Sequence, residues 1–152
     1  MNEKELVLEM SRKTHRSRTA ILLVEARHFG KEPDIAAQAG MDHRDFTAYL
    51  ASEISENARY VDITTAKLFD KLRYLAGSPE GGDCLLVYNF DLPLARLDTE
   101  DRLRLWKNIR DNMAHKQRAL VLLMPADAAH LLPTEDELST WDSSSRLAKA
   151  EY

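Results

Sequence analysis

The stretch that decides the fold is Leu22–Glu32, LLVEARHFGKE, in which an apolar run stops at Glu25 and a loop containing Gly30 and Lys31 follows. The run is almost continuously apolar rather than alternating. Continuous apolar runs of this length are typical of strands that are covered on both faces, as in a parallel sheet. We therefore expect a buried strand over Ala20–Ala26 and a loop directly after it.

Three more short apolar runs alternate with segments of helical periodicity. The further predicted strands are Arg59–Ile63, Asp83–Asn89 and Ala119–Met124. The predicted helices cover residues 41–54, 64–77 and 98–116, and a last helix begins at 134. This alternation predicts an α/β fold, a three-layer sandwich with a mostly parallel sheet of about four to five strands. We expect residues 1–152 to form a single domain.

The two ends of the chain differ in charge. Residues 1–18 are basic near their end and form either a helix or a loose arm, whereas residues 134–152 form an acidic helix or tail. Thr134 and Glu137 have the spacing of a capping box, which predicts the start of the last helix. Asp42, with Asp45 three residues later, is the predicted cap of the helix over residues 41–54.

Composition limits the compartment and the partners. The net charge of −4 and a pI of about 5.7 argue neither for nucleic acid nor for an anionic membrane as an obligate partner. The one cysteine, Cys84, cannot form a disulfide within the chain, which fits a reducing compartment. The first residues are mixed and acidic, unlike a signal peptide, and no apolar run approaches about 20 residues. We expect a cytoplasmic protein without a membrane contact.

The octet of residues 25–32, EARHFGKE, has the length of the phosphate-binding loop GxxxxGK[ST]. In that loop, glycines let backbone N–H groups wrap the phosphates, and the hydroxyl holds magnesium. Here Glu25 replaces the first glycine and Glu32 replaces the hydroxyl residue, and a carboxylate near phosphate costs several kcal/mol in a partly buried cleft. We therefore expect no cofactor, and ATP with magnesium is disfavoured. If a nucleotide does bind, its contacts are Gly30, Lys31 and Asp91.

The third strand offers a second test of nucleotide chemistry. In nucleotide hydrolases of this plan, an apolar strand ends in an aspartate that positions magnesium. In LLVYNFD, Leu85–Asp91, that position is Tyr88 or Asn89, although Asp91 stays near the carboxyl edge of the sheet. The histidines show no metal-ligand spacing either. We therefore expect no catalytic residue and no metal site.

The Gly-Lys loop, the LLVYNFD strand and the late VLLMP strand together resemble a minimal P-loop NTPase core without a lid domain. Among small proteins of that plan, the chain is similar to the BrxF proteins of type 3 BREX phage-defence systems. The resemblance implies a defence-system component with a degenerate nucleotide site, a pseudo-ATPase. It also implies partners among the other protein subunits of a defence complex, or a second copy of the chain. Because three site residues depart from the pattern, a non-catalytic scaffold or recognition subunit is the leading hypothesis.

Two alternatives stay open beside it. One is an atypical nucleotide-binding ATPase subunit that uses Lys31, Asp91 and Glu32. The other is a DNA-binding accessory protein, since a handful of basic side chains suffices for salt-sensitive binding to phosphate backbones; its contacts are Arg12, Lys13, Arg16 and Arg18. Trp141 either covers the core or anchors a partner protein, because tryptophan is enriched among interface hot spots.

Overall fold

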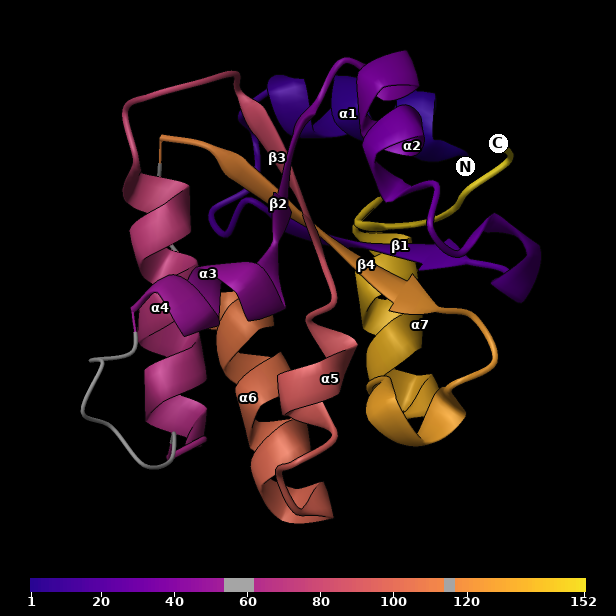
Figure 1. Ribbon diagram of the computed structural model, residues 1–152. Helices are drawn as coiled ribbons and strands as arrows, with labels where there is room; N and C mark the ends of the chain where they lie inside the picture. The colour runs from indigo at the N-terminus through magenta and orange to yellow at the C-terminus, as the bar shows by residue number, and fades with distance from the viewer. Residues whose placement is uncertain (54–61, 114–116) are drawn as a thin grey trace.

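The computed structural model describes residues 1–53, 62–113 and 117–152 as an α/β fold around one parallel sheet (Figure 1). Within these residues the sheet has five strands in the order β2-β3-β4-β1-β5. The strands are β1 Thr19–Val24, β2 Asp42–Asp45, β3 Cys84–Tyr88, β4 Ala119–Pro125 and β5 Leu147–Lys149. The helices are α1 Glu3–Ser11, α2 Glu32–Ala39, α3 Phe46–Ser52, α4 Thr65–Gly77, α5 Asp91–Leu94, α6 Thr99–Asn112 and α7 Glu135–Ser143.

Both faces of the central strands are buried, which explains the continuous apolar runs. Along β1, Ile21 packs into the core under α4, α6 and α7, whereas Ala20 and Leu22 pack into the core under α1 and α2. Strand β4 alternates in the same way between the two cores. Side chains that point to either face of the sheet therefore have to be apolar. The expected sheet between two helical layers is confirmed (Figure 1).

The prediction for residues 42–45 was wrong. Asp42–Asp45 is the edge strand β2, paired in parallel with β3, and not the first turn of a helix. Its side chains are largely exposed, so it carries no apolar pattern. The next helix, α3, begins at Phe46, and the Asp45 carboxylate accepts hydrogen bonds from the N–H groups of Thr47 and Ala48. Asp42 instead accepts from Gly82 N–H and pairs with Arg118, both at 2.6 Å.

Other predicted elements are confirmed with shifted ends. Helix α4 begins after its cap Thr64, and α6 begins after Asp98, whose carboxylate accepts from Asp101 N–H at 2.8 Å. For the predicted strand Arg59–Ile63, residues 59–61 lie outside the described part of the chain, and residues 62 and 63 belong to no strand. Residues 114–116, at the end of the predicted helix 98–116, also lie outside it.

Both terminal segments pack on the sheet. Residues 3–11 form helix α1, whose Leu6 and Met10 are fully buried, so the interpretation as a loose arm was wrong. The C-terminal segment begins as predicted, with the Thr134 hydroxyl accepting from Glu137 N–H. It does not continue as a helix or tail, because β5 pairs in parallel with β1 and extends the sheet.

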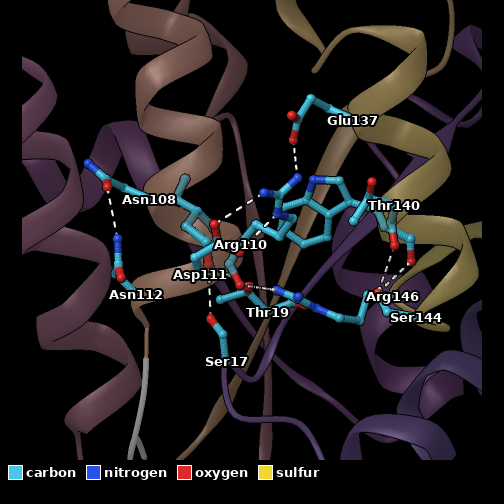
Figure 2. A network of polar contacts seen from close by, with 12 residues as sticks. Ser17, Thr19, Asn108, Arg110, Asp111, Asn112, Glu137, Thr140, Ser144 and Arg146 are labelled. Atoms are coloured by element: carbon cyan, nitrogen blue, oxygen red, sulfur yellow. Dashed lines mark hydrogen bonds and ion pairs between the residues drawn. The ribbon is translucent and has the colours of Figure 1, made fainter.

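A buried network joins the last strand to the sheet and to α6 (Figure 2). The Arg146 guanidinium donates to the Thr19 carbonyl at 2.7 Å, to the Thr19 hydroxyl at 2.6 Å and to the Arg110 carbonyl at 3.0 Å. The Thr19 hydroxyl in turn donates to the Ile109 carbonyl at 2.9 Å. Burial lowers the pKa of Arg146 to about 10. The group stays charged at neutral pH, and these acceptors offset its desolvation.

Replacing Thr19 with Val tests this network, because Val keeps the shape of the fully buried side chain and removes its hydroxyl. Arg146 loses one acceptor and the Ile109 carbonyl loses one donor, so we expect Thr19→Val to lower the free energy of unfolding by about 1–3 kcal/mol. Urea denaturation measures this change. Thr19→Ser keeps the hydroxyl and is the matched control, which should lose less. A Val variant as stable as the original chain would contradict the assigned bonds.

Candidate functional site

A cavity of about 330 Å³ lies at the carboxyl edge of the sheet, where ligands bind in open α/β folds. We call it the strand-end cavity. One wall is the loop after β1, the opposite wall is the end of β3 and the start of α5, and the end of β4 lies between them. Its lining residues are Phe29, Gly30, Glu32, Tyr88, Asn89, Asp91, Leu123 and Pro125.

Two backbone positions shape the walls. Gly30 has φ of 86°, which glycine adopts without steric cost, and this turn leads the chain into α2. Pro33 in the first turn of α2 favours helix initiation there. Asn89 has φ of 61° directly after β3, a left-handed conformation that asparagine tolerates better than most residues. Glycine and asparagine at these places therefore turn both loops at the edge of the sheet.

The lining of the strand-end cavity carries carboxylates from both walls. Burial, together with the negative charge of Glu32, raises the pKa of Asp91. Burial also raises the pKa of Tyr88, with smaller effects from Asp45 and Glu32. In both residues the charge of Glu32 is the smallest of the named effects, and it raises the pKa as a neighbouring carboxylate does. A negatively charged lining favours cationic groups and disfavours phosphates.

The predicted nucleotide contacts separate in the structure. Gly30 and Asp91 line the cavity, as does Glu32. The Lys31 ammonium lies 5.5 Å from the ring centroid of Tyr152, as a cation–π contact outside the cavity lining. The buried ring of His28 packs edge-on against the same tyrosine, with centroids 5.7 Å apart. Tyr152 thus holds the loop on its outer side, a contact that no local motif predicts.

Glu25 does not act as the sequence suggested. It is not among the lining residues of the strand-end cavity. Its carboxylate pairs with the Arg27 guanidinium at 2.8 Å and with the Lys149 ammonium at 3.1 Å. The hydrogen bond from Lys149, followed by the charge of Arg27, lowers the pKa of Glu25. The carboxylates in the lining of this cavity are those of Glu32 and Asp91 instead.

The four basic residues predicted to bind nucleic acid also separate. Arg12, Lys13 and Arg16 are exposed and follow α1, with Arg12 as the cap of its C-terminal end. Arg18 is only 7% exposed, and its guanidinium lies 3.0 Å from both carboxylate oxygens of Asp83. Arg18 therefore ties the start of β1 to the start of β3, and its inclusion in an accessible patch was wrong.

Trp141 lies in the core. It has no exposed surface, and its ring packs edge-on against Trp106 with centroids 6.2 Å apart. The Arg146 guanidinium covers the ring at 4.4 Å from its centroid. Of the two interpretations of this residue, covering the core fits the structure, and the partner-anchor interpretation does not, because no part of the side chain reaches the surface.

Sequence reasoning missed the floor of the strand-end cavity, formed by Leu123 and Pro125 at the end of β4. Proline ending an apolar strand was the available signal.

In the described part of the chain, no three His, Cys, Asp or Glu side chains gather as a metal-ligand set. Among those same residues, no helix has the length and apolar character to cross a membrane.

Comparisons with known proteins add no assignment. No family model matches the chain, and searches of curated proteins and of solved structures find no match.

The raised pKa of Asp91 gives a prediction with a definite sign. Since the folded chain binds the Asp91 proton more tightly than the unfolded chain, ionised Asp91 destabilises the fold above both pKa values. Asp91→Asn should therefore be more stable than the original chain at about pH 7, and its advantage should shrink toward about pH 4 as Asp91 becomes protonated. Urea denaturation across this range measures the difference.

Asp127→Asn is the matched control, because Asp127 is an exposed carboxylate beyond β4. It should show no comparable gain at neutral pH. An Asp91→Asn advantage that is absent at about pH 7, or that grows as the pH falls, would contradict the assigned environment of Asp91.

Proposed function

We propose that this chain is a P-loop-like α/β domain without ATPase chemistry, and that it works as a scaffold or recognition subunit. Its setting is a multi-protein bacterial anti-phage defence system of the BREX type, as the sequence resemblance implies. It binds other subunits of that system and uses no nucleotide as fuel. Two features support the proposal. The loop after β1 and the end of β3 resemble the sequence pattern of a nucleotide site, but the cavity between them has a negatively charged lining, which opposes a nucleotide.

The single observation that carries the proposal is the arrangement of charge at the strand-end cavity. Glu32 and Asp91 line the cavity, whereas the Lys31 ammonium lies on the ring of Tyr152. Two like unit charges about 4 Å apart repel by roughly 4 kcal/mol at an effective dielectric constant of about 20. A triphosphate in this cavity meets that repulsion and lacks the lysine that offsets it in a phosphate-binding loop.

Strand order supports the P-loop-like part of the proposal. β4 lies between β1, which carries the Gly-Lys loop, and β3, which carries the LLVYNFD segment. An extra strand between these two strands is the arrangement for which the additional-strand class of P-loop NTPases is named. The likeness is one of topology, and topology alone does not assign an activity.

We predict that Mg-ATP leaves the melting temperature of the chain unchanged. A ligand at one hundred times its Kd adds about 2.7 kcal/mol, which for a chain of this size raises the melting temperature by about 5–10 °C. Differential scanning fluorimetry at millimolar Mg-ATP and Mg-ADP detects a shift of that size. A saturable shift that Lys31→Ala abolishes would contradict the proposal and favour the atypical ATPase subunit.

The scaffold role predicts a stable complex. When the tagged chain is expressed in its host at native level, we expect the products of neighbouring genes to co-elute with it in size-exclusion chromatography. Complex formation should be insensitive to Lys31→Ala, because that side chain lies on Tyr152. A chain that elutes alone, at the size of a monomer, would count against a subunit role.

A further inference from the structure

Among the described residues, strand β2 is an edge strand of the sheet. It forms the end of the strand order, and in the described part of the chain it pairs only with β3 (Figure 1). A strand paired on one side presents a row of unpaired N–H and C=O groups on the other, at the spacing of a pleated strand. The residues Asp42, His43 and Arg44 of this strand are exposed.

A second cavity, of about 450 Å³, lies beside this edge, and we call it the edge cavity. Tyr74 forms an aromatic wall and is 69% exposed, which is unusual for so large a ring. It stacks on the buried Tyr49, with centroids 6.5 Å apart and 14° between the planes, and the Arg44 guanidinium lies 5.2 Å from the Tyr49 centroid. Leu75 and Leu85 add apolar surface.

We propose that the β2 edge and the edge cavity bind an extended segment of a partner protein. The segment adds a strand beside β2 through backbone hydrogen bonds and inserts one large aromatic or aliphatic side chain between Tyr74 and Arg44. In this mode of recognition, the backbone bonds give affinity and the pocket for alternate side chains gives specificity. The proposal rests on the proposed function, since it supplies the contact by which a recognition subunit holds another protein.

The charges on β2 argue against a second copy of this chain as the occupant. In the antiparallel register that uses all four residues, Asp42 of one copy lies opposite Asp45 of the other, twice in each pair. Like charges directly opposite one another destabilise a strand pair. The sequence of β2 therefore disfavours self-pairing and leaves the edge available to a different sequence.

The charge balance also argues against single-stranded nucleic acid, which an exposed aromatic ring beside an arginine could otherwise attract. The edge cavity is lined by the acidic Asp42, Glu53 and Glu80 as well as by Arg44 and Arg118. Asp42 and Arg118 pair with each other, and Glu53 pairs with Lys71. No surplus of positive charge remains in the lining to hold the phosphates of a nucleic acid. A polypeptide carries no phosphates, so it needs no such surplus.

The test selects binding peptides from a displayed library of random extended segments, each about eight residues long and so a little longer than a typical strand. A selected peptide is then measured against the full chain in two ways. Hydrogen–deuterium exchange reads protection of the β2 amides, and titration reads affinity for the original chain, for Tyr74→Ala and for the control Phe29→Ala. Phe29 is also a half-exposed aromatic residue, but it lines the strand-end cavity.

We expect the peptide to slow exchange at β2, and Tyr74→Ala to weaken binding by about tenfold or more, as for a hot-spot residue, with no change in Phe29→Ala. Three results would each overturn the proposal: no peptide enriched above background, binding that leaves the β2 amides unprotected, or binding unaffected by Tyr74→Ala. Binding of an oligodeoxythymidylate with the same Tyr74 dependence would overturn it in favour of a nucleic-acid platform. The proposed function fails if Mg-ATP raises the melting temperature of the original chain, a measurement that involves no peptide. Failure of the proposed function and failure of the peptide-binding proposal can therefore be told apart.

Discussion

The structure depends on one constraint: β3, β4 and β1 are parallel and buried on both faces. These strands need apolar side chains toward both faces of the sheet. The hydrogen-bonded registers between the strands fix where each strand ends. Because parallel strands end at the same edge, the loop after β1 and the segment after β3 meet there. The strand-end cavity is a consequence of that convergence.

What the cavity can bind follows from a few side chains on this frame. The backbone turn at Gly30 brings the loop to the edge of the sheet, as a phosphate-binding loop requires. The lining is nevertheless negative, because Glu32 and Asp91 occupy opposite walls. Lys31 lies against Tyr152, near the end of the chain, so the cation that should serve the cavity instead helps to hold the C-terminal segment on the loop. The backbone turn resembles that of a nucleotide site, whereas the charge of the cavity lining opposes a phosphate. We therefore favour binding of proteins over use of a nucleotide.

The sequence was informative where local chemistry decides the outcome. Continuous apolar runs predicted β1, β3 and β4, and cap residues such as Thr64 and Asp98 predicted the starts of helices. It failed for β2, whose side chains are largely exposed, and for β5, which has only three residues. Both are short edge strands that are stabilised by pairing with a neighbour and are too short or too polar to show an apolar period.

The candidate site shows the same division. The octet of residues 25–32 and the end of β3 were each examined as parts of a nucleotide site, and the structure places Gly30, Glu32 and Asp91 around one cavity. The directions of the side chains were not predictable. Glu25 pairs with Lys149 and Arg18 pairs with Asp83, and both partners are distant in sequence. Such pairs follow from tertiary packing, which no motif of eight residues contains.

The most direct measurement of the central claim is a titration of the ¹⁵N-labelled chain with Mg-ATP, followed at the backbone amides of Gly30, Lys31 and Glu32. We predict that these resonances stay in place up to millimolar nucleotide, because the carboxylates of Glu32 and Asp91 in the lining repel phosphate. Saturable shifts confined to this loop and to Asp91 would contradict this prediction and would make the strand-end cavity a nucleotide site.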